Sequence, residues 1–568
     1  MSKSHCRTPP VGGVSTLAGE RGAAKISGEG PPSSSTGSPS QDGRTEYMLV
    51  HSAGALLERC GLAYGPQTAV VYGDRRITYT EQIARIRQTG RALLSLGLEK
   101  GDRVAVLMAD RPELLDVYYG ALWAGLAIVP LNAKASASDH AYIIGDCGAR
   151  VVVHDGSKAD RVDGARGETD IEHVFSVDEE AVLDRGGYLP HLVAKQSDAP
   201  GRPEVTPDDR YGIFYTGGTT GRPKGVEHNH RAFVAAMMSE MLELGLGERD
   251  RFAHVAPLTH AGGLFVLPVW LRGGTNVILG GFNPDQFKAT VAAEKITSSM
   301  MVPTMMYVLM DSLKNGSEGL ESLSTVIYGA SPIGKERLLQ AIDTFGPIFS
   351  QLYGQTEAPN QLTVLRKSDH AMAIESGDLT PLSSCGRPVG IADVRLVDDD
   401  LKDVADGDPG EIVAQGPHIM RGYWNRPEET AAALRDGWLC TGDVAKADER
   451  GFLYIVDRKK DMIISGGFNV YPKEVEATLF GHPAVKDVCV IGVPDDKWGE
   501  SVKAVVVLDP DVSVEAGELI AYVRERKGPV LTPKTVDFVD AIPLTAVGKH
   551  DKPALRSAHW GGRDRGVN

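Results

Sequence analysis

Along most of the chain, short runs of hydrophobic residues alternate with longer segments whose apolar residues recur at helical spacing. A strand pair is predicted over 69–79, followed by a helix that opens at Thr80. The apolar run 104–108 predicts a buried strand, 112–125 a helix and 127–130 a further strand. Strands that alternate with helices of this length indicate βαβ units and a largely parallel sheet.

The pattern changes near the charged run 457–461, which is therefore a hinge candidate. Before it, further strands are predicted over 151–154, 276–279, 298–302 and 325–328. After it, we predict a helix from Pro472, strands over 485–493 and 502–508, and a helix over 514–526. The predicted fold class is α/β. A large N-terminal domain has several subdomains with mixed or parallel sheets flanked by helices, and a small mobile C-terminal domain is α+β.

Residues 1–45 are rich in Gly, Ser and Pro and carry few aromatic or β-branched residues, so a disordered tail is predicted there. The N-terminal domain then spans 46–459 and the C-terminal domain 460–568. The length of 568 residues agrees with several domains, and 42% hydrophobic and 24% charged residues are typical of a globular protein.

The net charge of −15 argues against a nucleic-acid partner, because the whole molecule repels polyanions. Six scattered cysteines without a CxxC pair indicate a reducing compartment. The sequence has no secretory signal pattern and no run of about 18 uncharged apolar residues. We therefore expect a cytoplasmic protein without an integral membrane segment, as a monomer or homodimer.

A Gly- and Thr-rich segment over 215–225, directly after an apolar run, predicts a polyphosphate-binding loop. Its glycines let the backbone approach a ligand closely, its hydroxyls supply donors, and Lys224 supplies a cation. The segment does not fit the P-loop template, because Pro223 intervenes and Gly-Lys-Ser/Thr is missing at the required spacing. The loop residues expected at the phosphates are Thr216, Gly217, Gly218, Thr219, Thr220, Gly221 and Lys224.

Eight motifs, in order, cover nearly all of residues 50–556: they lie at 215–225, 257–260, 328–332, 353–357, 441–443, 457–461, 465–472 and 543–549. In these motifs the chain resembles the adenylate-forming superfamily of acyl-CoA synthetases, luciferases and peptide-synthetase adenylation domains. One departure is Gly217, which stands where the family more often has Ser and removes one hydroxyl donor.

The resemblance implies that these motifs bind ATP and Mg²⁺. It assigns Asp443, whose two acceptor oxygens suit a diol, to the ribose, with Arg458 assisting. It assigns Thr356 to the α-phosphate and Glu357 to Mg²⁺, a hard cation that offsets charge beside phosphate oxygens. The other implied ATP contacts are Gly329, Ala330, Ser331, Tyr353, Gly354, Gln355 and Ile455.

The implied reaction has two halves: a carboxylate attacks the α-phosphorus of ATP, and a thiol then displaces AMP from the acyl-adenylate. Lys549 is the implied adenylation lysine, and such preorganised charge is worth about 3 kcal/mol or more. The implied coenzyme A contacts are Ser465, Gly466, Gly467 and Phe468. Both groups lie in the C-terminal domain and cannot serve one centre at once, so the resemblance implies rotation about Lys460.

The acyl pocket is expected around His260, which the resemblance places at its mouth as a catalytic residue. The other expected wall residues are Gly262, Gly263, Val302, Met305, Tyr328 and Gly329. These residues are small or apolar and include an adaptable methionine, with no ionisable group for an α-ammonium. The pattern favours a fatty or bulky alicyclic acid.

Coenzyme A is the expected acceptor. Few residues follow Lys549, which argues against a fused carrier domain. No sizeable insertion separates Asp457 from Ser465, which argues against a ligase that loads a separate carrier protein. An alternative is a ligase that delivers the acyl group to a separate carrier protein. A third possibility is a nucleotide-binding regulatory protein without turnover, against which the presence of Lys549, Glu357 and Asp443 argues.

Overall fold

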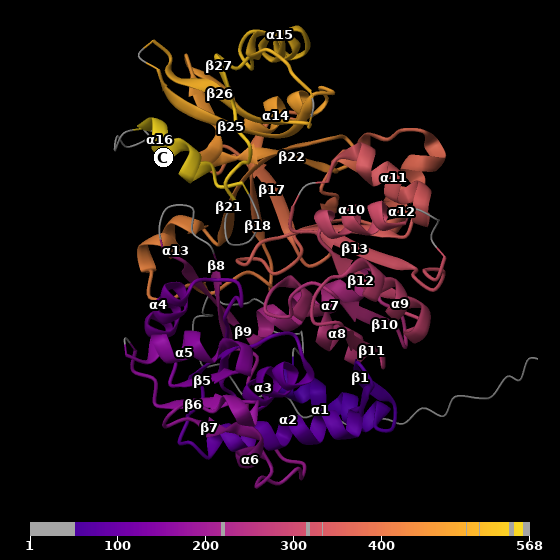
Figure 1. Cartoon of the computed structure of the whole chain (residues 1–568), viewed down its shortest axis with the longest axis vertical. Helices are drawn as coiled ribbons and strands as arrows, with labels where there is room; N and C mark the ends of the chain where they lie inside the picture. Colours follow the sequence, from indigo (N-terminus) through magenta and orange to yellow (C-terminus); the bar gives the residue numbers. More distant parts are fainter. Residues whose placement is uncertain are drawn as a thin grey trace, which may run out of the picture. The chain divides into compact units, whose positions relative to one another are not determined.

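The computed structural model describes residues 51–167, 169–216, 222–313, 318–331, 333–495, 497–510, 512–544 and 550–560 (Figure 1). The predicted disordered segment 1–45 lies outside the described residues. So do Gly217, Gly218, Thr219, Thr220 and Gly221 of the phosphate loop, and Lys549. Within the described ranges, the strands form four sheets.

The first sheet has the order β19-β9-β8-β4-β3-β5-β6-β7. Its strands from β8 to β7 run parallel, whereas β9 and β19 add antiparallel neighbours at one edge. The bounds are β3 Arg103–Leu107, β4 Ala127–Pro130, β5 Val151–His154, β6 His173–Ser176, β7 Gly187–Tyr188, β8 Arg210–Thr216, β9 Lys224–Asn229 and β19 Gly422–Tyr423. The predicted βαβ rhythm is confirmed here.

The second sheet has the order β16-β15-β14-β13-β12-β10-β11-β1-β2. It is parallel from β14 to β1 and antiparallel at both edges. The bounds are β1 Thr68–Tyr72, β2 Arg75–Thr78, β10 Arg251–His254, β11 Thr275–Ile278, β12 Ser298–Met301, β13 Thr325–Gly329, β14 Phe349–Tyr353, β15 Thr363–Leu365 and β16 Arg387–Pro388.

Helices cover both faces of these two sheets. One apolar core joins side chains of β3, β4 and β5 to side chains of β1 and β11 through α1, α2, α3, α7 and α8, so these helices form a layer between the sheets. The outer faces pack on α4 and α5 and on α9–α12. The bounds are α1 Ala53–Tyr64, α2 Tyr79–Leu94, α3 Pro112–Trp123, α4 Ala137–Cys147, α5 Ala159–Arg166, α6 Leu189–Val193, α7 His230–Glu243, α8 Val266–Leu271, α9 Pro284–Glu294, α10 Pro303–Ser312, α11 Lys335–Phe345 and α12 Lys367–Ser376.

The start of α2 differs slightly from the sequence prediction, which opened this helix at Thr80. Thr78 is the N-cap: its side chain accepts a hydrogen bond from the Glu81 backbone, and the Glu81 carboxylate accepts one from the Thr78 backbone. This capping box satisfies two backbone donors and stabilises the earlier start.

A third sheet follows in the order β17-β18-β21-β20, with β22 beside β21. Its bounds are β17 Asp393–Val397, β18 Gly410–Gln415, β20 Leu434–Arg435, β21 Trp438–Ala447 and β22 Leu453–Arg458, with α13 at Pro427–Ala433. Its β21–β22 pair places Asp443 directly opposite Arg458.

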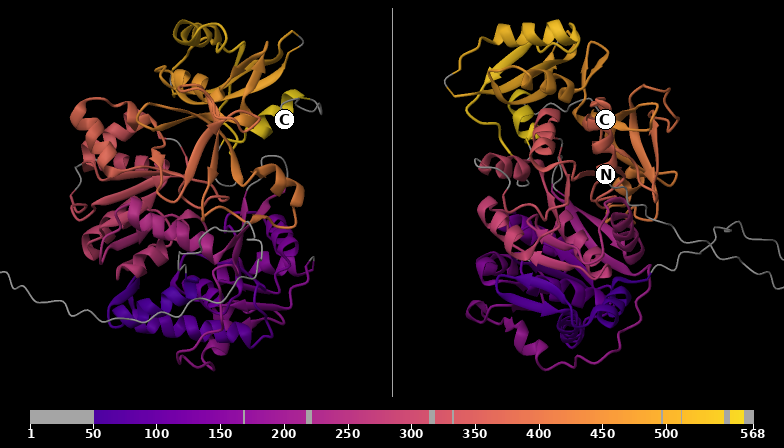
Figure 2. Two further views of the ribbon diagram at one scale, coloured as in Figure 1. Left: turned by 180° about the vertical axis from the view of Figure 1, so that it is seen from behind. Right: turned by 90° about the vertical axis from the view of Figure 1, so that its right-hand side faces the viewer.

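The fourth sheet is built wholly from residues after 461, in the order β24-β23-β26-β25 with β27 beside β26. Helices lie beside this sheet in the C-terminal part of the chain (Figure 2). One apolar cluster packs α14 and α15 on one face, and α16 contributes to a second cluster. The bounds are β23 Ile463–Ser465, β24 Phe468–Val470, β25 Val485–Asp495, β26 Gly499–Leu508, β27 Thr535–Phe538, α14 Pro472–Phe480, α15 Ala516–Lys527 and α16 Lys552–Trp560. The exact boundary at 459/460 stays a prediction.

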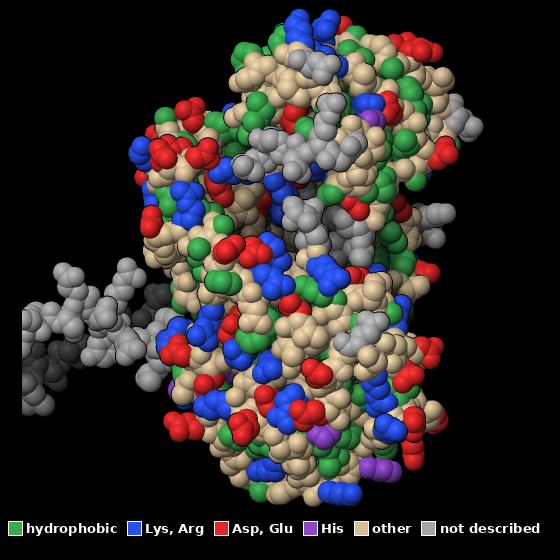
Figure 3. All heavy atoms as spheres, turned by 90° about the vertical axis from the view of Figure 1, so that its left-hand side faces the viewer, with side chains coloured by type: hydrophobic (Ala, Val, Ile, Leu, Met, Phe, Trp, Pro, Cys, Tyr) green, Lys and Arg blue, Asp and Glu red, His purple; other side chains and the backbone are tan. Residues whose placement is uncertain are grey.

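Basic and acidic side chains are interspersed over the face seen in Figure 3. None of the helices in the described ranges is long and apolar enough to cross a bilayer.

Candidate functional site

The carboxylate of Asp443 is held by three donors from two segments, 353–355 and β22. The Tyr353 hydroxyl and the Gln355 side-chain amide each donate to Asp443 Oδ2 at 2.7 Å. Arg458 Nε lies 3.0 Å from Oδ1. Burial, with the Asp443 charge nearby, raises the pKa of Tyr353 well above its usual value, so this phenol remains a donor. The carboxylate is therefore oriented before any ligand arrives.

Thr356 and Glu357 directly follow this cluster, and each has a supporting residue that the sequence did not reveal. His228 Nε2 donates to the Thr356 carbonyl at 2.7 Å, and burial lowers the pKa of His228 to about 4, so the ring is neutral. The Tyr423 hydroxyl donates to Glu357 Oε1 at 2.8 Å. These two contacts fix the backbone of one residue and the carboxylate of the next.

The two described ends of the phosphate loop, Thr216 and Lys224, lie next to each other. Thr216 and Lys224 face each other across the β8–β9 pair, and the Thr216 hydroxyl donates to the Lys224 carbonyl at 3.5 Å. Lys224 Nζ lies 5.4 Å from the centroid of the Tyr423 ring, a cation–π distance. Tyr423 thus contacts both the Lys224 ammonium and the Glu357 carboxylate.

The implied ATP contacts over 329–331 lie where β13 ends. Gly329 packs so closely that a Cβ there would approach Leu352 O to 2.5 Å, and the next residue, Ala330, has φ +64°. This left-handed conformation costs an alanine about 1–2 kcal/mol, and such strain concentrates at functional sites. Ser331 follows directly, and Ile455 lies half-buried on β22 opposite Ala445.

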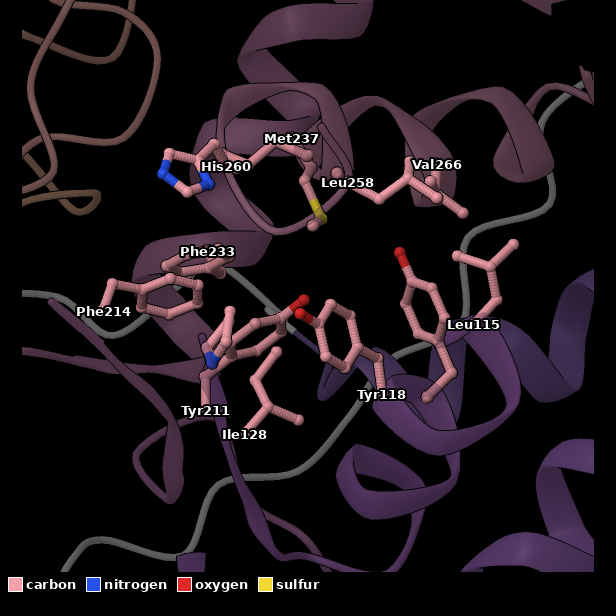
Figure 4. A pocket seen from close by; sticks show the side chains of 14 residues that line it. Leu115, Tyr118, Ile128, Tyr211, Phe214, Phe233, Met237, Leu258, His260 and Val266 are labelled. Carbon is pink, nitrogen blue, oxygen red and sulfur yellow. The ribbon is translucent and has the colours of Figure 1, made fainter. Parts of the chain in front are cut away.

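A narrow cavity opens beside His260 (Figure 4). Its wall includes Gly263, and the Thr259 hydroxyl lies 2.9 Å from His260 Nδ1. Burial lowers the pKa of His260, which favours a neutral ring. Gly262 adjoins this wall at a position where a Cβ would approach Ala256 O to 2.6 Å, so only glycine fits without displacing the backbone.

The structure does not bring the other expected acyl residues to this cavity. The Tyr328 side chain is fully buried in the core against α12, where its hydroxyl lies 2.9 Å from His370 Nε2. Met305 packs against the same core, and Val302 is the N-cap of α10. Side chains alternate between the two faces of a strand, so a motif on β13 identifies the strand end but not the face.

The cavity walls instead come from segments that carry none of the eight motifs, chiefly α3 and α7, and from β8. Phe233 and Met237, one helical turn apart on α7, both line the cavity. Their spacing places them on one helix face, the only signal the sequence offered. Asn229 caps this helix by accepting a hydrogen bond from the Ala232 backbone, which sets where the turn begins.

The glycine pair expected at coenzyme A forms the turn between β23 and β24. Gly466 has φ +61° and Gly467 φ +84°, conformations that favour glycine. A Cβ on Gly466 would lie 2.4 Å from the Trp498 ring. Ser465 pairs with Phe468 across this turn, and Phe468 is 59% exposed.

The hinge candidate Lys460 lies in a single turn, Lys459–Asp461, between the third and fourth sheets. Burial and the nearby Arg458 charge lower the pKa of Lys460 to about 8. On one side of the turn, Asp457 accepts a hydrogen bond from the Lys473 backbone at 2.8 Å. On the other, Arg556 of α16 lies 2.5 Å from Asp461. Asp457, before the turn, and Asp461, its last residue, therefore contact helices that pack on the fourth sheet.

Comparison with known proteins shows two family matches. Residues 57–424 match the AMP-binding enzyme family and residues 474–549 the AMP-binding enzyme C-terminal domain. A medium/long-chain-fatty-acid–CoA ligase, FadD8 of Mycobacterium tuberculosis, is 40% identical over 87% of this chain and 88% of its own. A feruloyl-CoA synthase of an Amycolatopsis species is 37% identical over 86% and 95%.

Solved structures agree in fold. ATP-bound MatB from Rhodopseudomonas palustris superposes with a TM-score of 0.80 at 30% identity, over 89% of this chain and 99% of that one. The amide bond synthetase McbA from Marinactinospora thermotolerans gives 0.81 at 30% identity over the same shares, 89% and 99%. The α/β two-domain architecture predicted from the sequence is confirmed.

Proposed function

We propose that this chain, which belongs to the family of AMP-binding enzymes, activates an apolar carboxylic acid and passes the acyl group to coenzyme A. The proposed acid is fatty or bulky alicyclic. The chain is an AMP-forming acid–thiol ligase that uses ATP, Mg²⁺ and coenzyme A. The observation that carries the choice of acid is the cavity beside His260, whose described lining contains aliphatic, aromatic and glycine residues and no acidic or basic side chain other than His260.

In the first half-reaction, the acid's carboxylate oxygen bonds to the α-phosphorus of ATP as the bond to pyrophosphate breaks. We assign Asp443, whose carboxylate is oriented by three donors, to the ribose hydroxyls. We assign Thr356 to the α-phosphate, and Lys224 with Lys549 to the charge that develops there. Fixed positive charge of this kind lowers the barrier because it needs no reorganisation during reaction.

Glu357 fits a role as the protein ligand of Mg²⁺. Its Oε1 accepts from Tyr423, and among the described residues no hydrogen bond is formed to Oε2. Carboxylate oxygens suit this hard cation, which would supply positive charge beside the phosphates. We infer that Mg²⁺ is bound by this one carboxylate together with phosphate and water oxygens.

In the second half-reaction, the thiol sulfur bonds to the acyl carbon as AMP leaves. We assign Ser465, Gly466, Gly467 and Phe468 to the pantetheine arm, because a glycine turn without side chains lets a narrow ligand approach the backbone. A rotation at Lys460 would exchange Lys549 for this turn at one centre. The short turn between two sheets is suited to absorb such a change.

A carrier protein as acceptor is the second candidate, because a fatty acid–[acyl-carrier-protein] ligase, ScoC of Streptomyces coeruleorubidus, is 31% identical over 88% of this chain. Pyrophosphate release over a panel of acids, with coenzyme A, with a carrier protein and with neither, separates the candidates when thioesters are identified by mass spectrometry. Release without a coenzyme A thioester would contradict the first proposal. No release with any acid would favour a regulatory protein.

We also propose a cytoplasmic location and a monomer or homodimer. The location is supported by the cysteines of the described ranges, all of which are free thiols. Cell fractionation tests the first point and light scattering the second.

A further inference from the structure

The cavity beside His260 contains a polar group that its apolar walls leave without a partner. Tyr118, on α3, is 7% exposed and lines the cavity, yet its hydroxyl forms no hydrogen bond with any described residue. A buried hydroxyl without a partner is unfavourable, and a ligand that supplies one recovers that free energy.

The neighbouring groups do not satisfy this hydroxyl. The nearby Asp110 carboxylate, which contributes to raising the pKa of Tyr118, accepts instead from the Leu258 backbone at 3.0 Å. The adjacent Tyr119 also lines the cavity, but its hydroxyl is not among the buried polar atoms left without a partner. Of these two consecutive tyrosines on α3, Tyr118 is the one whose buried hydroxyl has no partner among the described residues.

Tyr118 and His260 lie at different parts of the cavity wall. Figure 4 shows Tyr118 across the cavity from His260 and Met237. Stacked rings form part of the wall between them, with the Phe233 ring 4.2 Å from that of Tyr211 and 4.7 Å from that of Phe214. The cavity volume is about 20 Å³, room for about one water-sized group, so a longer occupant requires movement of a flexible side chain such as Met237.

We propose that the acid substrate carries a hydroxyl or carbonyl oxygen remote from its carboxylate, and that the Tyr118 hydroxyl donates a hydrogen bond to this oxygen. The inference rests on the proposed function and refines it: the body of the acid is apolar, and one distal oxygen selects it. A site built to hydrogen-bond a substrate rejects the analogue that lacks the group far more strongly than an apolar pocket rejects a missing methylene.

Two matched substrate pairs test the proposal: 4-hydroxycinnamate with cinnamate, and 10-hydroxydecanoate with decanoate. The kcat/KM for coenzyme A-dependent pyrophosphate release is measured for the full-length wild type, Tyr118→Phe and Tyr119→Phe. In at least one pair, the wild type should favour the oxygenated acid by about tenfold or more. Tyr118→Phe should bring this ratio close to one by slowing the oxygenated acid, whereas Tyr119→Phe should keep it.

A wild type that shows no preference in either pair would overturn the inference, and this comparison does not depend on any variant folding. Equal slowing of both pair members by Tyr118→Phe would also overturn it, since a structural residue acts on both alike. In both cases, continued thioester formation leaves the ligase function intact. Absence of pyrophosphate release with every acid would instead overturn the proposed function together with the inference.

Discussion

Replacing Glu240 with glutamine should stabilise this protein more as the pH rises. Glu240 lies on α7 with no exposed surface; Asn360 donates to its Oε1 at 2.6 Å, and its Oε2 has no partner among the described residues. Burial raises the pKa of this carboxyl to about 8, although the Asn360 hydrogen bond opposes the shift. The folded protein therefore keeps Glu240 neutral at pH 7.

The size of this effect on the free energy of unfolding follows from the difference between the pKa values of Glu240 in the unfolded and folded states. In the unfolded chain the group ionises near its ordinary value of 4.5, whereas in the folded protein it ionises near 8. Between these values the folded state holds a proton that the unfolded state has lost, so the free energy of unfolding falls as pH rises. With about 1.4 kcal/mol for each unit between the two pKa values, the total loss is about 5 kcal/mol, complete above the folded value.

The assay is urea unfolding of wild type and Glu240→Gln at pH values from about 5 to about 9, followed by tryptophan fluorescence. Glutamine keeps the shape and one acceptor oxygen but cannot ionise, so the stability difference should grow by about 1.4 kcal/mol per pH unit up to pH 8. The exposed Glu248, mutated to Gln, removes the same carboxylate from the unfolded chain without removing a buried carboxyl from the folded one, and serves as control. Parallel curves for wild type and Glu240→Gln would refute the reasoning.

Three further predictions concern the two half-reactions. Lys549→Ala should slow adenylation by about a hundredfold or more while thioester formation from supplied acyl-adenylate continues; equal loss of both would contradict the hinge proposal. Tyr423→Phe removes the hydrogen-bond donor to Glu357, so adenylation should slow about fivefold to tenfold and require a higher Mg²⁺ concentration. Magnesium titration of the adenylation rate checks this, and an unchanged Mg²⁺ dependence would show that Tyr423 does not support metal binding. Gly466→Ala places a Cβ against Trp498 at positive φ and should slow thioester formation by at least about tenfold, with adenylation by pyrophosphate exchange unchanged; impaired exchange would argue for general misfolding.

The sequence by itself determined the secondary structure and the family. Strand and helix periods depend on residues a few positions apart, so the β3–α3–β4 unit lies within two residues of its prediction. The ordered motifs selected Asp443 and Glu357 as site candidates without coordinates. The start of α2 at Tyr79 was predicted one residue too late. The Thr78 capping box satisfies backbone groups one turn before the apolar pattern begins.

Only the tertiary structure decided which residues support the candidate site and which line the cavity beside His260. His228 reaches Thr356 across 128 residues of sequence and Tyr423 reaches Glu357 across 66, and no local pattern encodes contacts at that range. Tyr328 belongs to a recognised motif, yet its ring enters the core, whereas Tyr118 lines the cavity without belonging to one. Strand pairing and helix packing fix these positions, because they decide which side chains from distant segments share a buried space.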